Sequence, residues 1–553
     1  MSQDLLARAR DWAAADPDPA TRGELEELIA QGETPELADR FDGTLEFGTA
    51  GLRGALGAGP NRMNRVVVLR AAAGLASYLL ESGTHGPVVI GYDARHNSDV
   101  FARDTAEVMT GAGLPAIVLP RPLPTPLLAF AIGDLECAAG VMVTASHNPP
   151  QDNGYKVYLG GAMGGGSQIV PPADEQIAAR IAAVGAVADI PRGDGGEVLG
   201  DDVLERYLDR VVSLVTPGPR DLRLVYTPLH GVGGLVVQTA LARAGFEAPH
   251  VVTAQAEPDP DFPTTPFPNP EEPGAMDLAM ALAEEVEADL VVANDPDADR
   301  CAVAIPTGRS GAPGWQMLRG DEVGALLAEH LLSSGRTGVY ATSIVSSSLL
   351  GKMAAAAGQD YVETLTGFKW IGRVPGLAFG YEEALGYCAD PERVHDKDGV
   401  SALLLVCDRA ARAKAEGRGL RDVLDDLALR FGLHATDQIS LRMDDLSAIP
   451  PLLDRLLAHP PATLGGLEVL GVDDLSQGAD DLPPTTGLRL RLADDARVVV
   501  RPSGTEPKLK CYLEVVIPVE QTDPEDDPVD AARISAAGRL DAIRSDLRVA
   551  MGL

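Results

Sequence analysis

The chain has 553 residues, enough for about three or four domains, and its composition is 45% hydrophobic and only 4% aromatic. Its 81 acidic and 46 basic residues give a formal net charge of −35, which argues against a nucleic-acid partner and means that an anionic substrate needs a local cluster of cations. No apolar stretch approaches the roughly 20 residues of a membrane span, and the N-terminus lacks the apolar core of a secretory signal. The five scattered cysteines favour buried free thiols over a disulfide framework. We therefore expect a cytoplasmic protein without a membrane partner.

A recurring supersecondary pattern follows the first 40 residues, which are rich in alanine, leucine and charge and predict a helical extension. After a glycine-rich loop that carries Arg53, the order strand, turn, helix, glycine, strand occurs three times. The three copies begin with the strands Val88–Asp93, Leu222–Tyr226 and Val339–Thr342. Each copy predicts a βαβ unit with two parallel strands, and three copies predict three α/β domains of related build.

A serine closely follows one of the predicted apolar strands. The run Ala138–Val143 predicts a buried strand, and Ser146 comes shortly after it, before Pro149. A serine hydroxyl at a strand end can carry a phosphoryl group. His147 beside it suggests a hydrolase triad, but adjacent residues rarely orient as nucleophile and base, and Gly-x-Ser-x-Gly is absent. Lys156 is a candidate general acid or base if neighbouring cations lower its pKa, and a surface lysine is the alternative.

Three carboxylates alternate directly after the predicted strand Ala288–Asn294, in the motif Asp-Pro-Asp-Ala-Asp-Arg. Ligands of open α/β sheets bind at this carboxyl end of the strands. Three anions so close together repel one another unless a cation joins them, and oxygen ligands favour Mg²⁺ or Mn²⁺ over zinc. The motif therefore predicts a metal site at Asp295, Asp297 and Asp299, with an exposed acidic turn as the alternative.

Two later segments have the composition of substrate-binding loops. Glu382 and Glu383 lie among aromatic residues and glycine, which suits sugar hydroxyls, although helix-start acids are the alternative. The segment Arg501–Lys508 combines two cations with hydroxyls and backbone N–H groups after an apolar strand. It predicts a phosphate-binding loop, with an ordinary turn as the alternative.

The C-terminal part differs from the three repeats. Leu488–Leu492 and Arg497–Arg501 are separated by two aspartates and predict a hairpin, Lys510–Val516 predicts a further strand, and Ala531–Met551 predicts a closing helix. This order is typical of a smaller α+β domain with an antiparallel sheet.

Together, the motifs Thr144–Pro149, Asp295–Arg300 and Arg501–Thr505 resemble those of the α-D-phosphohexomutase superfamily, and they occur in the family's order. The resemblance runs from about Gly48 to Val516. It implies an α/β fold in which three related α/β domains with mixed or parallel sheets and a smaller C-terminal α+β domain surround a central cleft. The segments we expect are a helical extension (1–40), domain I with the serine (41–205), domain II with the metal loop (206–317), domain III with the sugar loop (318–435) and the C-terminal domain with the phosphate loop (436–553).

The resemblance also implies a role for each candidate residue. Ser146 is the phosphorylated serine, and its phosphate joins the three aspartates around one Mg²⁺ per chain. The flanking catalytic residues are Arg53, His147, Lys156 and Arg300. The substrate-binding residues are Lys369, Glu382, Glu383, Arg501, Ser503, Gly504, Thr505 and Lys508. In the implied reaction Ser146 passes its phosphoryl group to a sugar monophosphate, and the resulting bisphosphate, which also serves as activator, returns its other phosphate to the serine.

Three loops are most similar to the mixed phosphoglucomutase–phosphopentomutase branch: Gly48–Gly54, Thr366–Trp370 and Glu382–Tyr387. The expected reaction interconverts glucose 1-phosphate and glucose 6-phosphate in a monomer or homodimer. Phosphomannomutase and phosphopentomutase activities are the alternatives, because Ala384 stands where other branches often place serine. A phosphatase is less favoured, because hydrolysis needs no second phosphate-binding loop. A non-catalytic relative is less favoured too, because it would typically lack the serine or a metal-binding carboxylate.

Overall fold

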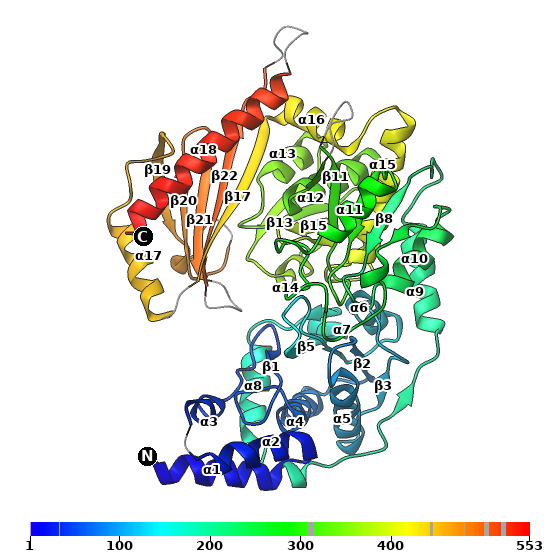
Figure 1. Cartoon of the computed structure of the whole chain (residues 1–553), viewed down its shortest axis with the longest axis vertical. Helices are drawn as coiled ribbons and strands as arrows, with labels where there is room; N and C mark the ends of the chain where they lie inside the picture. Colours follow the sequence, from blue (N-terminus) through cyan, green and yellow to red (C-terminus); the bar gives the residue numbers. More distant parts are fainter. Residues whose placement is uncertain are drawn as a thin grey trace. The chain divides into compact units, whose positions relative to one another are not determined.

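The structure is a computed structural model that describes residues 2–32, 34–307, 314–442, 446–479, 482–502, 508–520 and 527–552. The chain forms two compact units (Figure 1). The first comprises Met1–Leu318 and Gly386–Arg412, and the second comprises Arg319–Leu385 and Ala413–Leu553. The chain therefore leaves the first unit, builds part of the second, and returns before it completes the second. This division does not test the predicted boundaries of the helical extension and the four domains, which stay a prediction.

The N-terminal segment is helical, as predicted. It forms α1 (Ser2–Ala15), α2 (Pro19–Ala30) and α3 (Pro35–Arg40). Asp18 and Thr34 cap α2 and α3 by accepting hydrogen bonds from backbone N–H groups of the first turn. The three helices share a small apolar core that includes Leu25, Leu37 and Phe41.

The first sheet has seven strands in the order β1-β5-β4-β2-β3-β7, with β6 paired to β5. Strands β2, β3, β4 and β7 are parallel, and β1 and β5 run antiparallel to their neighbours. Helices α4, α5 and α8 share a core with one face of this sheet, and α6 packs on the other face. The strands are β1 (Leu52–Ala55), β2 (Val88–Tyr92), β3 (Ala116–Val118), β4 (Ala139–Val143), β5 (Asp152–Leu159), β6 (Ser167–Gln168) and β7 (Glu197–Val198). The helices are α4 (Arg65–Glu81), α5 (Ser98–Gly111), α6 (Thr125–Asp134), α7 (Gly161–Gly164), α8 (Ala173–Ala183), the 3₁₀ turn η1 (Val187–Asp189) and α9 (Asp202–Ser213).

The second sheet of the first unit has the order β12-β11-β10-β8-β9. Strand β8 is parallel to β9 and β10, whereas β10, β11 and β12 are antiparallel in turn. Its elements are β8 (Leu224–Thr227), α10 (Gly234–Arg243), β9 (His250–Val251), η2 (Thr253–Gln255), α11 (Asp277–Glu285), β10 (Leu290–Ala293), β11 (Ala302–Pro306) and β12 (Trp315–Met317). The returning segment adds β16 (Gly386–Cys388) and, up to Arg412, helix α15 (Gly399–Ala415).

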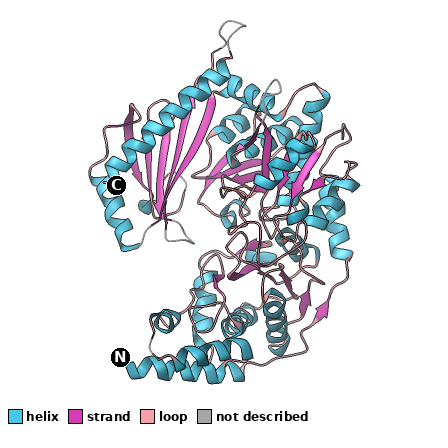
Figure 2. Cartoon of the chain, in the orientation of Figure 1, coloured by secondary structure: helices cyan, strands magenta, loops and turns pink. Residues whose placement is uncertain are grey.

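The second unit contains a parallel part and an antiparallel part (Figure 2). The parallel strands β14 (Asp360–Thr364), β13 (Val339–Ser343) and β15 (Leu377–Glu382) lie in that order. They are accompanied by α12 (Gly320–Ser333), α13 (Leu349–Ala356), α14 (Phe368–Ile371) and α16 (Leu420–Phe431). The antiparallel sheet has the order β17-β22-β21-β20-β19-β18, and α18 packs along β17 and β22. Its elements are β17 (Leu433–Arg442), η3 (Leu446–Ala448), α17 (Ile449–Ala458), β18 (Thr463–Leu464), β19 (Leu467–Asp474), η4 (Leu475–Gln477), β20 (Leu488–Leu492), β21 (Arg497–Pro502), β22 (Lys508–Ile517) and α18 (Pro528–Met551).

The predicted fold class is confirmed. The three βαβ units give the parallel pairs β2–β3, β8–β9 and β13–β14. The C-terminal hairpin β20–β21 is antiparallel, and Asp494 and Asp495 at its turn have φ of 59° and 56°, as a type I′ turn requires. All five cysteines are buried free thiols, as expected.

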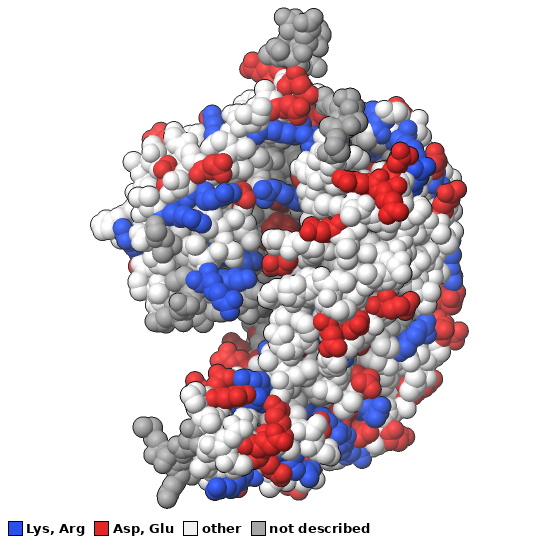
Figure 3. All heavy atoms as spheres, in the orientation of Figure 1, with Lys and Arg blue, Asp and Glu red and all other residues white. Residues whose placement is uncertain are grey.

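The surface of the first unit carries both signs of charge. Figure 3 shows acidic and basic side chains interspersed over the visible face of this unit. Among the helices in the described part of the chain, none combines the length and the apolar character needed to cross a membrane.

Candidate active site

Ser146 lies in the tight turn that follows β4. Its backbone has φ of 53°, a left-handed conformation that costs a non-glycine residue on the order of 1–3 kcal/mol. The side chain of Thr144 accepts a hydrogen bond from the Ser146 N–H at 2.9 Å. The residue is 3% exposed, so the turn holds the hydroxyl in a largely buried position.

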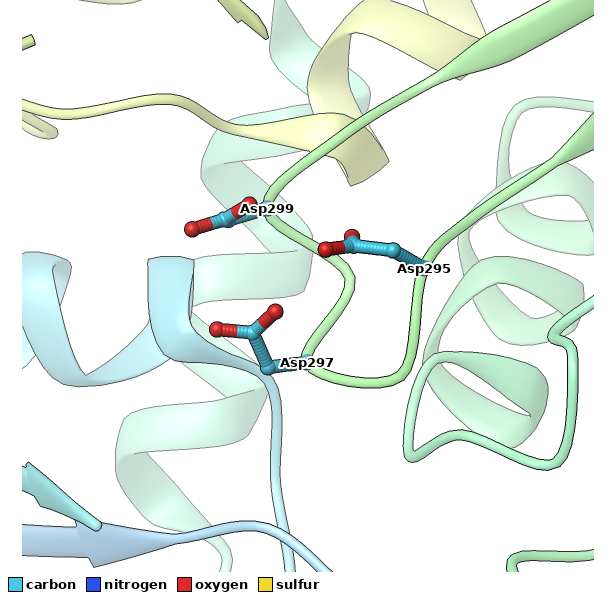
Figure 4. A group of neighbouring side chains, drawn as sticks. All are labelled: Asp295, Asp297 and Asp299. Atoms are coloured by element: carbon cyan, nitrogen blue, oxygen red, sulfur yellow. The ribbon is translucent and has the colours of Figure 1, made fainter. Parts of the chain in front are cut away.

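The three aspartates come from the loop between β10 and β11, and their side chains project toward a common space (Figure 4). All three residues are fully buried, and one carboxylate oxygen of each lies within 4.8 Å of the others. Ser146 Oγ donates a hydrogen bond to Asp295 Oδ2 at 2.9 Å. Two turns that are far apart in the sequence therefore meet at one place, and the alternative of an exposed acidic turn is wrong.

This carboxylate cluster fits a divalent cation. Asp297 Oδ1 and Asp299 Oδ1 are buried and accept no hydrogen bond from the described residues. Burying an anionic oxygen without a donor or a cation is costly. Burial raises the pKa of Asp295 well above its ordinary value, and the negative charges of Asp297 and Asp299 add to this effect. An oxygen-only donor set of this kind suits Mg²⁺.

Lys156 lies on β5 and is buried rather than on the surface. Its Nζ donates to Asp297 Oδ2 at 2.7 Å and to Asp299 Oδ2 at 3.0 Å. Burial alone would lower the pKa of Lys156, but the two carboxylates outweigh burial and raise it. Burial would raise the pKa values of Asp297 and Asp299, but Lys156, helped by the Thr125 hydrogen bond at Asp297 and by Lys397 and Arg300 at Asp299, lowers both of them. Lys156 is therefore an ammonium group in this arrangement, able to donate a proton but not to accept one.

His147 lies within hydrogen-bonding distance of the serine, with Nδ1 3.1 Å from Ser146 Oγ. The expectation that adjacent residues do not orient in this way does not hold here, where the backbone of Ser146 is left-handed. Burial, followed by the positive charges of Arg300 and Arg53, lowers the pKa of His147 well below its ordinary value. The imidazole is therefore neutral near pH 7.

Two predicted arginines border the same cluster. Arg53 lies on β1, which pairs with β5, and its Nη1 donates to Asn148 Oδ1 at 3.3 Å. Arg300 follows the aspartates, and its Nε is 3.9 Å from both Asp295 Oδ2 and Asp299 Oδ1. The strands β1 and β5, which present Arg53 and Lys156, were not predicted. Strand β1 lies in a glycine-rich segment, and β5 begins with a polar, turn-like stretch after Asp152.

Three further residues, which are not among the predicted site residues, also reach the site. Thr125, the first residue of α6, donates from Oγ1 to Asp297 Oδ2 at 2.6 Å. Lys397 Nζ lies 3.3 Å from Asp299 Oδ2. Arg95 donates from Nη2 to the backbone oxygen of Ser146 at 2.7 Å. The only sequence signal was the presence of Lys397 in an acidic, glycine-containing segment.

Backbone approaches fix the aspartate loop on two sides. A Cβ on Gly231 would lie 2.4 Å from Pro296 Cα, and a Cβ on Gly399 would lie 2.2 Å from the backbone oxygen of Arg300. Val232 N–H also donates to the backbone oxygen of Pro296 at 2.8 Å. Glycine is therefore required at both positions for the loop to keep this place.

The predicted substrate-binding residues lie in the second unit. Glu382 ends β15 and accepts a hydrogen bond from Gly367 N–H at 2.6 Å, so it is not a helix-start acid. Glu383 Oε2 accepts hydrogen bonds from two serine hydroxyls, and burial, with the charges of Glu382 and Asp321, raises the pKa of Glu383 to about 7. The remaining predicted residues are Lys369 on α14, Arg501 on β21 and Lys508 at the start of β22, whereas Ser503, Gly504 and Thr505 lie outside the described residues.

Four known domain families match the chain in order. They are Phosphoglucomutase/phosphomannomutase alpha/beta/alpha domain I (residues 44–187), domain II (residues 205–308), domain III (residues 319–431) and the C-terminal domain (residues 466–531). A crystal structure of a phosphoglucomutase/phosphomannomutase family protein from Burkholderia thailandensis has the same fold, with a TM-score of 0.67 at 21% identity over 91% of this chain and 97% of that one.

Relatives of three different names resemble most of the chain. A "Probable phosphomannomutase" of Haemophilus influenzae is 48% identical over 86% of this chain and 96% of its own length. A phosphopentomutase of Mus musculus is 34% identical over 95% and 92%, and a phosphoglucomutase of Staphylococcus haemolyticus is 34% identical over 86% and 90%, respectively. The chain therefore belongs to the α-D-phosphohexomutase superfamily and is a phosphotransferase-type isomerase.

Proposed function

We propose that this enzyme is a phosphosugar mutase in which Ser146 carries the phosphoryl group. The observation that supports this proposal most directly is the 2.9 Å contact between Ser146 Oγ and Asp295 Oδ2, beside a neutral histidine and a buried carboxylate cluster. A hydroxyl in this position can be esterified next to a cation site, which is the arrangement that phosphoryl transfer requires.

The proposed transfer moves one phosphoryl group between two oxygens. The bond from phosphorus to Ser146 Oγ breaks with its electron pair remaining on Oγ, and a bond from phosphorus to a sugar hydroxyl oxygen forms. The hydroxyl proton passes to His147, which is 3.1 Å from Oγ, and from there to Oγ. The sugar bisphosphate then returns its other phosphoryl group to Ser146 by the reverse steps.

Positive charge around the serine favours this transfer. Lys156, Arg53 and Arg300 are cations that can hold the phosphoryl oxygens. A divalent cation, which we propose is one Mg²⁺ held by Asp295, Asp297, Asp299 and the phosphoryl oxygen on Ser146, would neutralise the charge of the transferring group.

The proposal also includes substrate-binding roles for residues of the second unit. Glu382, Glu383 and Lys369 would bind sugar hydroxyls, and Arg501 and Lys508, together with the loop between them, would hold the phosphate that does not react. A sugar bisphosphate is the expected activator, because it can charge Ser146 with a phosphoryl group.

Glucose 1-phosphate and glucose 6-phosphate are the proposed substrate pair, on the strength of the three loops shared with the phosphoglucomutase–phosphopentomutase branch. Mannose phosphates are the second candidate, because the 48% identical relative is named a phosphomannomutase. Pentose phosphates are the third, because one relative is named a phosphopentomutase and another a probable phosphoribomutase. Parallel assays with glucose, mannose and ribose 1-phosphates, each with its bisphosphate activator, rank the three by kcat/KM.

Replacement of the serine tests the carrier role. We expect Ser146→Ala to lower kcat by several orders of magnitude, because the phosphoryl group then has no attachment point. The wild-type enzyme should lose activity in a chelator and regain it with Mg²⁺. Near-normal turnover of Ser146→Ala would refute the proposal, and release of free phosphate in place of the isomer would identify a phosphatase.

A further inference from the structure

The turn between β2 and α5 places a buried arginine underneath the serine turn. Arg95 is 4% exposed. Its Nη2 donates to the backbone oxygens of Ser146 at 2.7 Å and Asn148 at 2.5 Å. Its Nη1 donates to the backbone oxygens of Pro149 at 2.8 Å and Asp152 at 3.0 Å. One guanidinium group therefore binds four carbonyl oxygens of the segment that carries the serine.

Two other groups fix the guanidinium itself. Asp93 Oδ2 lies 3.4 Å from Arg95 Nε, and Asp93 Oδ1 accepts hydrogen bonds from the Arg95 N–H and from Ser98 Oγ. The guanidinium carbon lies 4.9 Å from the ring centroid of Phe262, within the range of a cation–π contact. Arg95 is thus held from its own turn and from the proline-rich segment around Phe262, and it has little freedom to follow a displaced serine turn.

We propose that Arg95 is a positioning residue for Ser146, an inference that rests on the carrier role proposed above. The left-handed backbone of Ser146 is an unfavourable conformation that surrounding contacts must impose. The hydrogen bond from Arg95 to the Ser146 carbonyl holds the peptide group directly after the strained Cα. This contact keeps Oγ at 2.9 Å from Asp295 Oδ2, and a displacement of about 1 Å there is enough to slow the transfer step.

Lysine cannot replace arginine in this role. A guanidinium group offers five donors in a planar fork, whereas an ammonium group is a point charge with three donors that cannot reach four spread carbonyls at once. Arg95→Lys therefore keeps the buried charge near Asp93 but loosens the serine turn. Arg65 provides a matched control in the same part of the chain. Within the part of the chain that the structure describes, its guanidinium forms a two-point ion pair with Asp104 at 2.7 Å for each bond and no hydrogen bond to the serine turn.

The experiment compares Arg95→Lys, Arg65→Lys and wild type in steady-state and single-turnover assays, with thermal unfolding of each variant. We expect Arg95→Lys to lower kcat about 100-fold, to change KM for the sugar phosphate by less than about twofold, and to slow phosphorylation of Ser146 by sugar bisphosphate by the same factor as kcat. Arg65→Lys should lower Tm yet leave kcat within about twofold of wild type. A kcat for Arg95→Lys equal to that of Arg65→Lys, or a loss that appears in KM alone, would overturn the inference.

A second variant keeps the inference testable if Arg95→Lys does not fold. Phe262→Leu removes the ring that packs on the guanidinium, so the guanidinium is held less firmly and its hydrogen bonds to the serine turn loosen. We expect a loss in kcat of about fivefold with KM unchanged. An unchanged kcat for a folded Phe262→Leu would then count against the inference. Ser146→Ala, assayed in parallel, separates the two proposals. If Ser146→Ala is active, the carrier role fails, whereas an inactive Ser146→Ala with a fully active Arg95→Lys refutes only the role of Arg95.

Discussion

At the scale of single residues, cations compensate the three buried aspartates of the site unequally. Asp295 carries the least compensation of the three aspartates. Lys156 contacts Asp297 and Asp299, and Lys397 contacts Asp299, whereas the nearest cation to Asp295 is Arg300 at 3.9 Å. Burial and charge repulsion at Asp295 therefore destabilise the metal-free folded state. This cost is tolerated because the same charge can bind a cation.

We predict that Asp295→Asn stabilises the metal-free protein by about 1–3 kcal/mol, because the amide removes the buried charge. Its oxygen can still accept the hydrogen bond from the Arg300 N–H, and its NH₂ group can donate to Ser146 Oγ in place of the bond that Asp295 accepts. Thermal unfolding in a chelator measures this gain. In excess Mg²⁺, wild type should gain stability through binding to the folded state, and the variant should gain much less. A metal-free variant with a lower Tm than wild type would contradict the prediction.

The candidate residues that could be predicted from the sequence are those with a local signature. The three aspartates alternate within one loop, and Ser146 follows an apolar strand, so both are visible without a structure. Thr125 and Arg95 have no such signature. Their partners are 172 and 51 residues away, and each contact depends on which turns the fold brings together. The chemistry at Lys156 could not be predicted either, because the direction of its pKa shift depends on Asp297, 141 residues away.

At the scale of elements, periodicity and turn residues identified the parallel pairs and the C-terminal hairpin, because a βαβ unit and a tight turn are local structures. Strand β1 and the antiparallel strand β5 were not predicted, because their pairing depends on the rest of the sheet and not on a local sequence pattern. The return of the chain to the first unit at Gly386 also has no local signal, yet it brings the start of α15 against the aspartate loop.

We predict that Gly399→Ala lowers kcat at least 10-fold and weakens Mg²⁺ binding. The added Cβ would lie 2.2 Å from the Arg300 backbone oxygen and 2.7 Å from that of Ala298, and a backbone atom cannot move aside without shifting the aspartate loop. Gly133→Ala is the control, because its Cβ would meet no atom within 4 Å. Steady-state assays over a range of Mg²⁺ concentrations measure the effect. Equal activity of the two variants would show that the loop tolerates the displacement.

At the scale of the whole molecule, the net charge of −35 opposes folding, because compaction brings like charges closer. With 81 acidic residues and 46 basic ones, most of the excess acids have no cation to pair with. Exposed ion pairs such as Arg243–Glu205 are weakened by salt, but each such pair contributes little to stability in the first place. Repulsion among the unpaired acids should therefore outweigh the pairs in the response to ionic strength.

We predict that Tm rises when NaCl is increased from 0.01 M to 1 M in the presence of a chelator, because the screening length falls from about 30 Å to about 3 Å and the repulsion is removed. The chelator excludes stabilisation by divalent ions at the aspartate loop. KCl should give the same rise, because screening depends on ionic strength and not on which monovalent cation is present. A Tm that falls with both salts would mean that the ion pairs dominate, and a rise with only one of them would point to a specific ion site.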